Sequence, residues 1–256
     1  MSLLPWTEGL WWIASLILLL WLHRRVHENA QAVLLLGTWN SRAAFLLYVI
    51  VLFPGVVFHE LSHWLAATVL AVRVRSFSLR PRREMGGRVR LGYITTDRAD
   101  PLRSALIGLA PTLVGSAALL IAYSASGLGA ITSEALRTGD IASVLGKVSD
   151  LLLTPNAGIW IYLAVVVGNN MLPSPSDRSS WLGAGLLVGA VFAGIAFLGA
   201  TEWVAIWALP PLRTVVRALA GSFSLVAILD LGLVVFLWLI RKVLEILTGR
   251  RVVERG

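Results

Sequence analysis

The feature that most restricts the fold of this chain is a series of apolar runs, each close to the ~20 residues that a helix needs to cross a bilayer. Only 14% of the 256 residues are charged, against about 25% in soluble domains. A soluble globular fold is therefore excluded, and we expect an all-α membrane protein with about six transmembrane helices. The expected spans cover residues 5–22, 43–72, 103–125, 156–172, 180–199 and 221–247.

Two segments outside these spans have different patterns. Residues 72–96 alternate apolar and basic side chains on both sides of a turn-prone stretch, which predicts a β-hairpin between the second and third spans. Residues 140–153 repeat apolar side chains at helical spacing, which predicts a short interfacial helix. The sequence shows no internal repeat and no long linker, so we expect one polytopic membrane domain over residues 1–256.

Lys and Arg outnumber Asp and Glu by 22 to 14, which gives a formal net charge of +8. In a membrane protein this excess is typical of cytoplasmic loops, so we expect the lipid bilayer rather than nucleic acid as a partner. Six spans with the N-terminus inside would put the hairpin and the C-terminal segment in the cytoplasm, and the connection after the first span outside. We therefore expect a multi-pass plasma-membrane protein. Zero cysteines exclude thiolate ligands, so a metal could be held only by His, Asp or Glu.

A metal-binding pattern, FHELSH, lies inside the second span at Phe58–His63. His59 and His63 are four residues apart on a helix, so both imidazoles lie on one face and can bind one Zn²⁺, while Glu60 can act as a general base toward water. At this chain's composition the pattern is expected about 0.002 times by chance. The alternative is a pair of packed histidines beside a protonated glutamate. Ionisable groups within a bilayer are costly and usually functional, which favours a site.

A catalytic zinc normally takes three protein ligands, so a third must come from elsewhere in the chain. Asp177 ends a Pro-interrupted segment, Asn169–Asp177, whose irregular backbone would lie at membrane depth. Such backbone is tolerated only where it is buried in protein or lines a wet cavity. Asp230, in the middle of the last span, is the rival ligand, and its alternative role is a buried carboxylate bonded to a neighbouring helix.

Three features together resemble the site-2 proteases, a family of intramembrane zinc metalloproteases. They are the Phe58–His63 motif within a membrane helix, the pattern Asn170-x-x-Pro173-x-Pro175-x-Asp177 on a later helix, and the small-residue stretch Leu106–Thr112. The resemblance covers about residues 43–182. It includes the hairpin, which in this family lies near the cytoplasmic face and helps to hold substrate. The chain departs from the family in Arg178, where glycine is usual, and in a shorter spacing before Asp177.

The resemblance implies a function and a role for each motif residue. His59, His63 and Asp177 would be zinc ligands, Glu60 the general base, and Asn170 a contact to the substrate backbone. The reaction would be hydrolysis of peptide bonds in or near the transmembrane segments of membrane-protein substrates, with the active site toward the cytoplasm. The alternative is a non-proteolytic zinc-binding membrane scaffold or adaptor.

Two further sets of residues give weaker expectations. Gly108, Thr112 and Ser116 follow a small-xxx-small pattern, and we expect them to pack against the metal-binding helix. His23 and His27 lie outside the motif, so we expect them to be solvated and give them no role.

Overall fold

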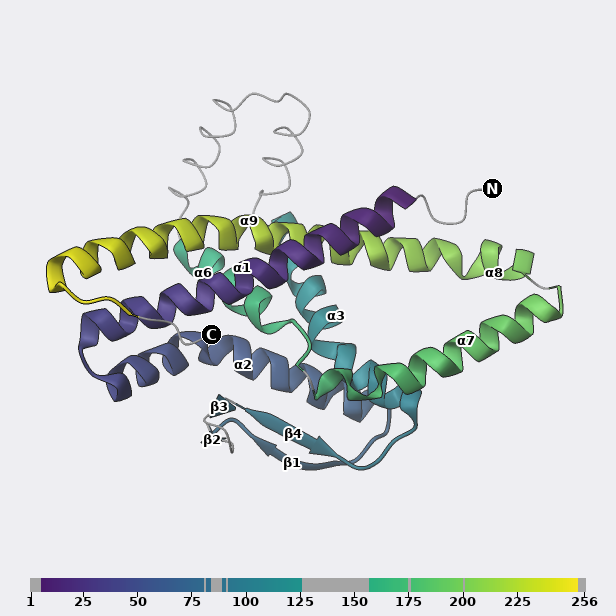
Figure 1. Ribbon diagram of the computed structural model, residues 1–256. Coiled ribbons are helices and arrows are strands. Elements are labelled where there is room, and N and C mark those ends of the chain that lie inside the picture. The colour runs from purple at the N-terminus through teal and green to yellow at the C-terminus, as the bar shows by residue number, and fades with distance from the viewer. Residues whose placement is uncertain are drawn as a thin grey trace.

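The computed structural model describes residues 6–80, 82–83, 89–90, 92–125, 157–174, 176–199 and 201–252. Its helices are α1 (Trp6–Thr38), α2 (Ser41–Val69), α3 (Pro101–Ala125), α6 (Ala157–Asn170), the 3₁₀ helix η1 (Asp177–Ser180), α7 (Trp181–Phe197), α8 (Thr201–Trp207) and α9 (Leu209–Thr248) (Figure 1). The strands are β1 (Val74–Ser78), β2 (Arg82–Arg83), β3 (Val89–Arg90) and β4 (Tyr93–Thr96). The expected helical fold with a β-hairpin is confirmed. The interfacial helix expected at 140–153 lies outside the described residues.

Five helices within the described residues are long and apolar enough to cross a membrane. They are α1, α2, α3, α9 and the continuous helical segment Asp177–Phe197, which consists of η1 and α7. The remaining expected span, α6, is apolar but has only 14 residues. Large apolar side chains cover the outside of these helices. In α7 only Ala184 is buried, while Leu182 is 77% exposed. Apolar surface of this extent needs lipid around it, so the chain is a multi-pass membrane protein.

Helix α1 is much longer than the expected span 5–22, because it continues to Thr38. No glycine or proline interrupts the sequence between Gly9 and Gly37. The polar middle of α1 is stabilised by local bonds: the Arg24 guanidinium lies 2.6 Å from the Glu28 carboxylate, and Asn29 Nδ2 donates to the Arg25 carbonyl at 2.9 Å. Helices α1 and α9 run side by side along most of their length (Figure 1).

The two ends of the α1–α9 pair correct the expected membrane topology. The Arg250 guanidinium lies 4.3 Å from the centre of the Trp39 ring, so the C-terminal segment and the turn between α1 and α2 lie at the same end (Figure 1). The expected topology put these two segments on opposite faces of the membrane. A contact this short cannot join opposite faces of a hydrocarbon core about 30 Å thick, so that part of the expectation is wrong.

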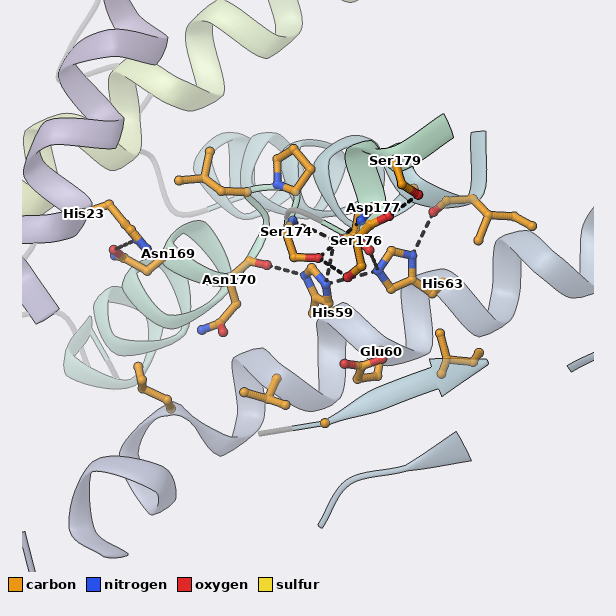
Figure 2. A pocket seen from close by; sticks show the side chains of 18 of the residues that line it. His23, His59, Glu60, His63, Asn169, Asn170, Ser174, Ser176, Asp177 and Ser179 are labelled. Carbon is orange, nitrogen blue, oxygen red and sulfur yellow. Dashed lines mark hydrogen bonds and ion pairs between the residues drawn. The ribbon is translucent and has the colours of Figure 1, made fainter. Parts of the chain in front are cut away.

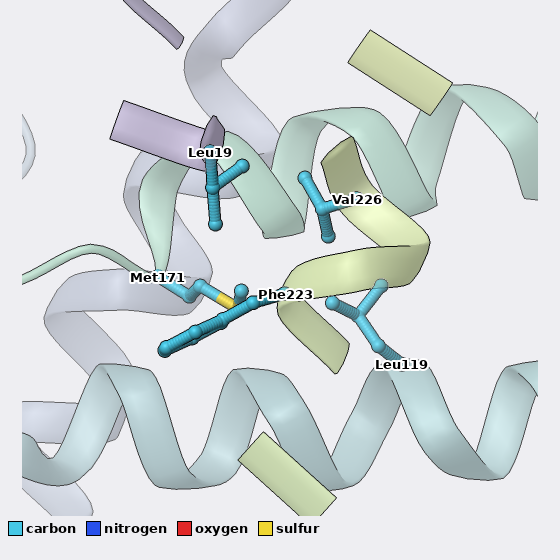
Figure 3. Packing of buried hydrophobic residues seen from close by; sticks show 5 residues of the cluster. All are labelled: Leu19, Leu119, Met171, Phe223 and Val226. Atoms are coloured by element: carbon cyan, nitrogen blue, oxygen red, sulfur yellow. The ribbon is translucent and has the colours of Figure 1, made fainter. Parts of the chain in front are cut away.

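The hydrophobic core lies where α1, α3 and α9 meet the chain that follows α6. Its buried side chains are Leu19, Leu119, Met171, Phe223 and Val226 (Figure 3). Met171 reaches this cluster because α3 carries glycine at position 115, where an added Cβ would lie 2.8 Å from the Met171 Cβ. The packing therefore fixes the start of the irregular segment after α6 within the bundle.

The β-hairpin lies beside α2 (Figure 1). Strands β1 and β4 pair antiparallel, with Phe77 opposite Ile94 and a register shift between Val74 and Ser76. Gly92, just before β4, is buried against α2, and a Cβ on this residue would lie 2.9 Å from Glu60 Cγ. The absence of a side chain at this position thus brings the hairpin directly against Glu60.

Candidate metal centre

Helix α2 carries His59 and His63, whose Nε2 atoms face each other. His59 Nδ1 donates to the Asn170 carbonyl at 2.5 Å, and His63 Nδ1 donates to the Ile107 carbonyl at 2.8 Å. A carbonyl oxygen only accepts, so each Nδ1 carries the hydrogen and each Nε2 keeps its lone pair. The two Nε2 atoms are 3.1 Å apart. Metal-binding histidines typically have this arrangement, in which the second ring nitrogen is held by an oxygen.

Asp177 completes a three-residue group around the same point. Its Oδ1 lies 3.3 Å from His63 Nε2, and its Oδ2 lies 3.6 Å from His59 Nε2. Ligands at ~2.0 to 2.1 Å from a tetrahedral zinc ion lie ~3.3 Å from one another. The separation of the two imidazole nitrogens and the distances from each of them to its nearer carboxylate oxygen, 3.1 to 3.6 Å, lie around this value, with Oδ1 beside His63 and Oδ2 beside His59. The residues therefore fit a metal ion such as zinc (Figure 2).

The loop that carries Asp177 is held by its own backbone and by α3. Within the loop, the Ser174 amide donates to Asp177 Oδ2 at 2.7 Å, and the Asp177 amide donates to the Ser174 carbonyl at 3.1 Å. From α3, the Thr112 hydroxyl donates to the Met171 carbonyl at 2.7 Å. Gly108 lies so close to the Asp177 carbonyl that any side chain there would overlap it.

The small residues of α3 have a use that the sequence did not predict. The expectation was that Gly108, Thr112 and Ser116 pack against the metal-binding helix, and α3 does lie against α2. In addition, Gly108 contacts the backbone of Asp177, while Thr112 and Ser116 donate hydrogen bonds to Met171. They accommodate a non-helical segment, which needs both close approach and donors for its free carbonyls.

Asn170 acts at the site through its backbone. Its carbonyl orients His59, whereas its side-chain Nδ2 donates to the Val166 carbonyl at 2.8 Å. The amide group lies against Gly55 of α2, where an added Cβ would be 2.5 Å from Nδ2. The sequence motif predicted a contact to substrate for Asn170 and gave no sign of this backbone role.

Asp230, the rival third ligand, lies outside the metal group. It is completely buried, and its Oδ1 accepts a hydrogen bond of 2.7 Å from Asn169 Nδ2. Asn169 Oδ1 in turn bonds to His23 Nδ1 at 3.0 Å. Asp230 therefore belongs to a polar network that links α9, α6 and α1, in agreement with its alternative role as a carboxylate bonded to a neighbouring helix.

A cavity of about 1030 Å³ joins these elements. The three metal-group residues and Glu60 line it, and Glu60 projects between α2 and the hairpin (Figure 2). Its other walls include Gly92, Ile94, Asn169, Asn170, Ser174, His23, His27 and Tyr48. The expectation that His23 and His27 are simply solvated is wrong, because both are half-buried and bonded to side chains of other helices. Their i,i+4 spacing, the same as in the Phe58–His63 motif, was the signal that could have found them.

Comparison of the chain with protein-family models, curated proteins and solved structures finds no match. Evidence about function therefore comes from the residues and geometry of the site. That geometry combines a three-ligand group, an adjacent buried carboxylate and a cavity among apolar helices that both polar and apolar residues line.

Proposed function

We propose that this chain is an intramembrane zinc metalloprotease that cleaves peptide bonds in or near the transmembrane segments of membrane proteins. The observation that carries the proposal is the convergence of His59, His63 and Asp177 beside Glu60 in one cavity. Structural zinc sites are closed by four protein ligands, and catalytic sites have three and leave a position open. A three-ligand group in a cavity of this size supports catalysis rather than a structural role.

In this proposal each group of the site has a distinct role in hydrolysis. His59, His63 and Asp177 would hold the ion, and the carbonyls of Asn170 and Ile107 keep the imidazoles oriented. Zinc, when bound, would polarise the scissile carbonyl and make the attacking water more acidic. Glu60 would take one proton from that water as the C–O bond forms, and would then deliver this proton to the amide nitrogen, after which the C–N bond breaks and the amine leaves.

The hairpin supports a role in substrate binding. A helical substrate hides its carbonyls in hydrogen bonds, so a segment must become extended before cleavage. Strand β4 runs beside the cavity through Ile94 and Thr96, and Gly92 holds its start against Glu60. An extended segment that pairs with the edge of this hairpin would pass close to the general base. The partner in this proposal is a transmembrane protein substrate.

The test is cleavage by the purified protein in lipid vesicles, measured against a panel of single-pass transmembrane segments. We expect cleavage by wild type, its loss on addition of a chelator, and a ~10²- to 10⁴-fold lower rate for Glu60→Gln. Zinc content should stay unchanged in Glu60→Gln, because this carboxylate is not one of the three ligands. Glu245→Gln is the matched control, since it makes the same chemical change at a residue that does not line the cavity.

Two outcomes would contradict the proposal. Undiminished cleavage in Glu60→Gln would remove the base from the mechanism. Zinc binding without cleavage of any segment, in wild type and variant alike, would favour the non-proteolytic scaffold or adaptor.

A further inference from the structure

The chain has four histidines, and they form two pairs with the same spacing. His59 and His63 lie on α2, while His23 and His27 are four residues apart on α1. Both pairs line the same cavity. All four imidazoles of the chain thus line one cavity, and the α1 pair has no part in the proposed hydrolysis.

The α1 pair repeats the ring geometry of the metal group. The His23 and His27 rings meet edge to face with centroids 4.2 Å apart, compared with 4.7 Å for His59 and His63. In each ring of the α1 pair, Nδ1 is bonded to an oxygen from another helix. His23 Nδ1 lies 3.0 Å from Asn169 Oδ1, and His27 Nδ1 lies 2.5 Å from the Tyr48 hydroxyl.

The hydrogen bonds of Asn169 fix the tautomer of His23. Asn169 Nδ2 donates to the Val165 carbonyl at 3.0 Å and to Asp230 Oδ1 at 2.7 Å, so both of its hydrogens are used. The Asn169 oxygen therefore faces His23, whose Nδ1 must donate, and His23 Nε2 keeps its lone pair. The Tyr48 hydroxyl can donate to His27 Nδ1 or accept from it, and His27 Nε2 is free to bind a metal in the tautomer in which the hydroxyl accepts. Oxygen partners on the second nitrogen are typical of histidines that bind metals.

We propose that His23 and His27 form a second binding site, through their Nε2 atoms, for a divalent transition-metal ion. Imidazole nitrogens suit zinc, copper and nickel ions. The described residues supply no carboxylate to this pair, since Asp230 is bonded to Asn169 and the metal group contains Asp177. Water completes the coordination, so the ion is held less tightly here than by His59, His63 and Asp177. This site does not depend on the proposed proteolysis.

Copper titration of metal-free, full-length protein tests the proposal, with a purification tag that contains no histidine. Electron paramagnetic resonance detects imidazole nitrogens bound to Cu²⁺, and the chain has no cysteine to compete. In the variant H59A/H63A, any imidazole signal comes from the α1 pair. We expect two bound equivalents with imidazole ligation in wild type, one in H59A/H63A, one in H23A/H27A, and none when all four residues are alanine.

Tyr48→Phe in the H59A/H63A background provides a milder test, since it removes one hydroxyl and keeps the ring. Loss of such a partner lowers metal affinity ~10- to 100-fold. Tyr162→Phe is the matched control, because its hydroxyl donates to the Val51 carbonyl at 2.6 Å and does not line the cavity. The proposal is overturned if H59A/H63A gives no imidazole signal, or if Tyr48→Phe and Tyr162→Phe have equal effects. Either result would leave the protease proposal intact.

Discussion

The contact between Gly108 and the Asp177 loop leads to a prediction about metal affinity. A Cβ on residue 108 would overlap the Asp177 carbonyl oxygen and lie 3.0 Å from its carbonyl carbon. Non-bonded carbon atoms prefer ~3.5 to 4.0 Å, so Gly108→Ala must push the loop back by about 0.5 Å or more. The loop cannot move as a whole, because Thr112 and the core cluster hold Met171.

A displacement of that size moves the third ligand away from its best position. Metal–ligand distances vary by only about 0.2 Å, so the Asp177 carboxylate would bind the ion with poorer geometry. We expect the zinc Kd of Gly108→Ala to rise ~10- to 100-fold, as when a supporting contact of a metal ligand is lost, which is about 1.4 to 2.8 kcal/mol. The assay is titration of metal-free protein with zinc against a chromophoric chelator.

Gly221→Ala provides the control for this substitution. Gly221 lies within α9, where an added Cβ has no atom within 4 Å, so its zinc Kd should match wild type. If Gly108→Ala binds zinc as tightly as Gly221→Ala, then α3 does not determine the position of Asp177, and the reasoning is refuted.

Three further predictions follow from the site and the hairpin. Asp177→Asn should lower zinc affinity and cleavage together, whereas Asp230→Asn should spare zinc, because Asp230 bonds to Asn169 rather than to the metal group; metal analysis of both variants decides, and the reverse pattern would make Asp230 the ligand. Gly92→Ala should displace Glu60 and reduce kcat while zinc content stays normal, since the added Cβ would lie 2.9 Å from Glu60 Cγ; full activity would show that the hairpin can shift freely. A cysteine at Ser78 should react with an impermeant reagent from the cytoplasmic side, because eight arginines lie between α2 and α3; labelling from outside alone would invert the topology.

Most of the fold was predictable because the signals that specify it are local. Runs of apolar residues predicted the membrane-spanning helices, and the alternation of apolar and basic residues predicted the β-hairpin. The continuation of α1 past Leu22 has local partners such as the Arg24–Glu28 pair, but other polar residues of this segment bond to partners that are distant in sequence and could not be predicted. His23 bonds to Asn169, and the Asn29 amide oxygen accepts from Arg241 at 3.4 Å. The contact between Arg250 and Trp39 also joins residues distant in sequence, so the common end of the C-terminal segment and the α1–α2 turn could not be predicted.

In the candidate site, too, some features follow from local sequence patterns and others do not. The four-residue spacing of His59 and His63 is a helix property, so their common face could be predicted from sequence. The choice between Asp177 and Asp230 depended on how α9 and the loop after α6 pack, which no local pattern specifies. The role of the Asn170 and Ile107 carbonyls also could not be predicted from sequence, because every residue has the same backbone carbonyl oxygen whatever its side chain.

Those two carbonyls link ion loading to the maturation of the protein. His59 and His63 belong to one helix, yet their orientation comes from the main chains of α6 and α3, and Asp177 arrives on a loop held by α3. A nascent chain with only α2 inserted has two of the ligands and neither of the contacts that orient them. Zinc at 1,000 times its Kd would stabilise the assembled bundle by about 4.1 kcal/mol and would leave an unassembled one unaffected. If the proposed function is right, hydrolytic activity would arise only after α3 and α6 have packed against α2, and incompletely folded chains would not cleave other membrane proteins.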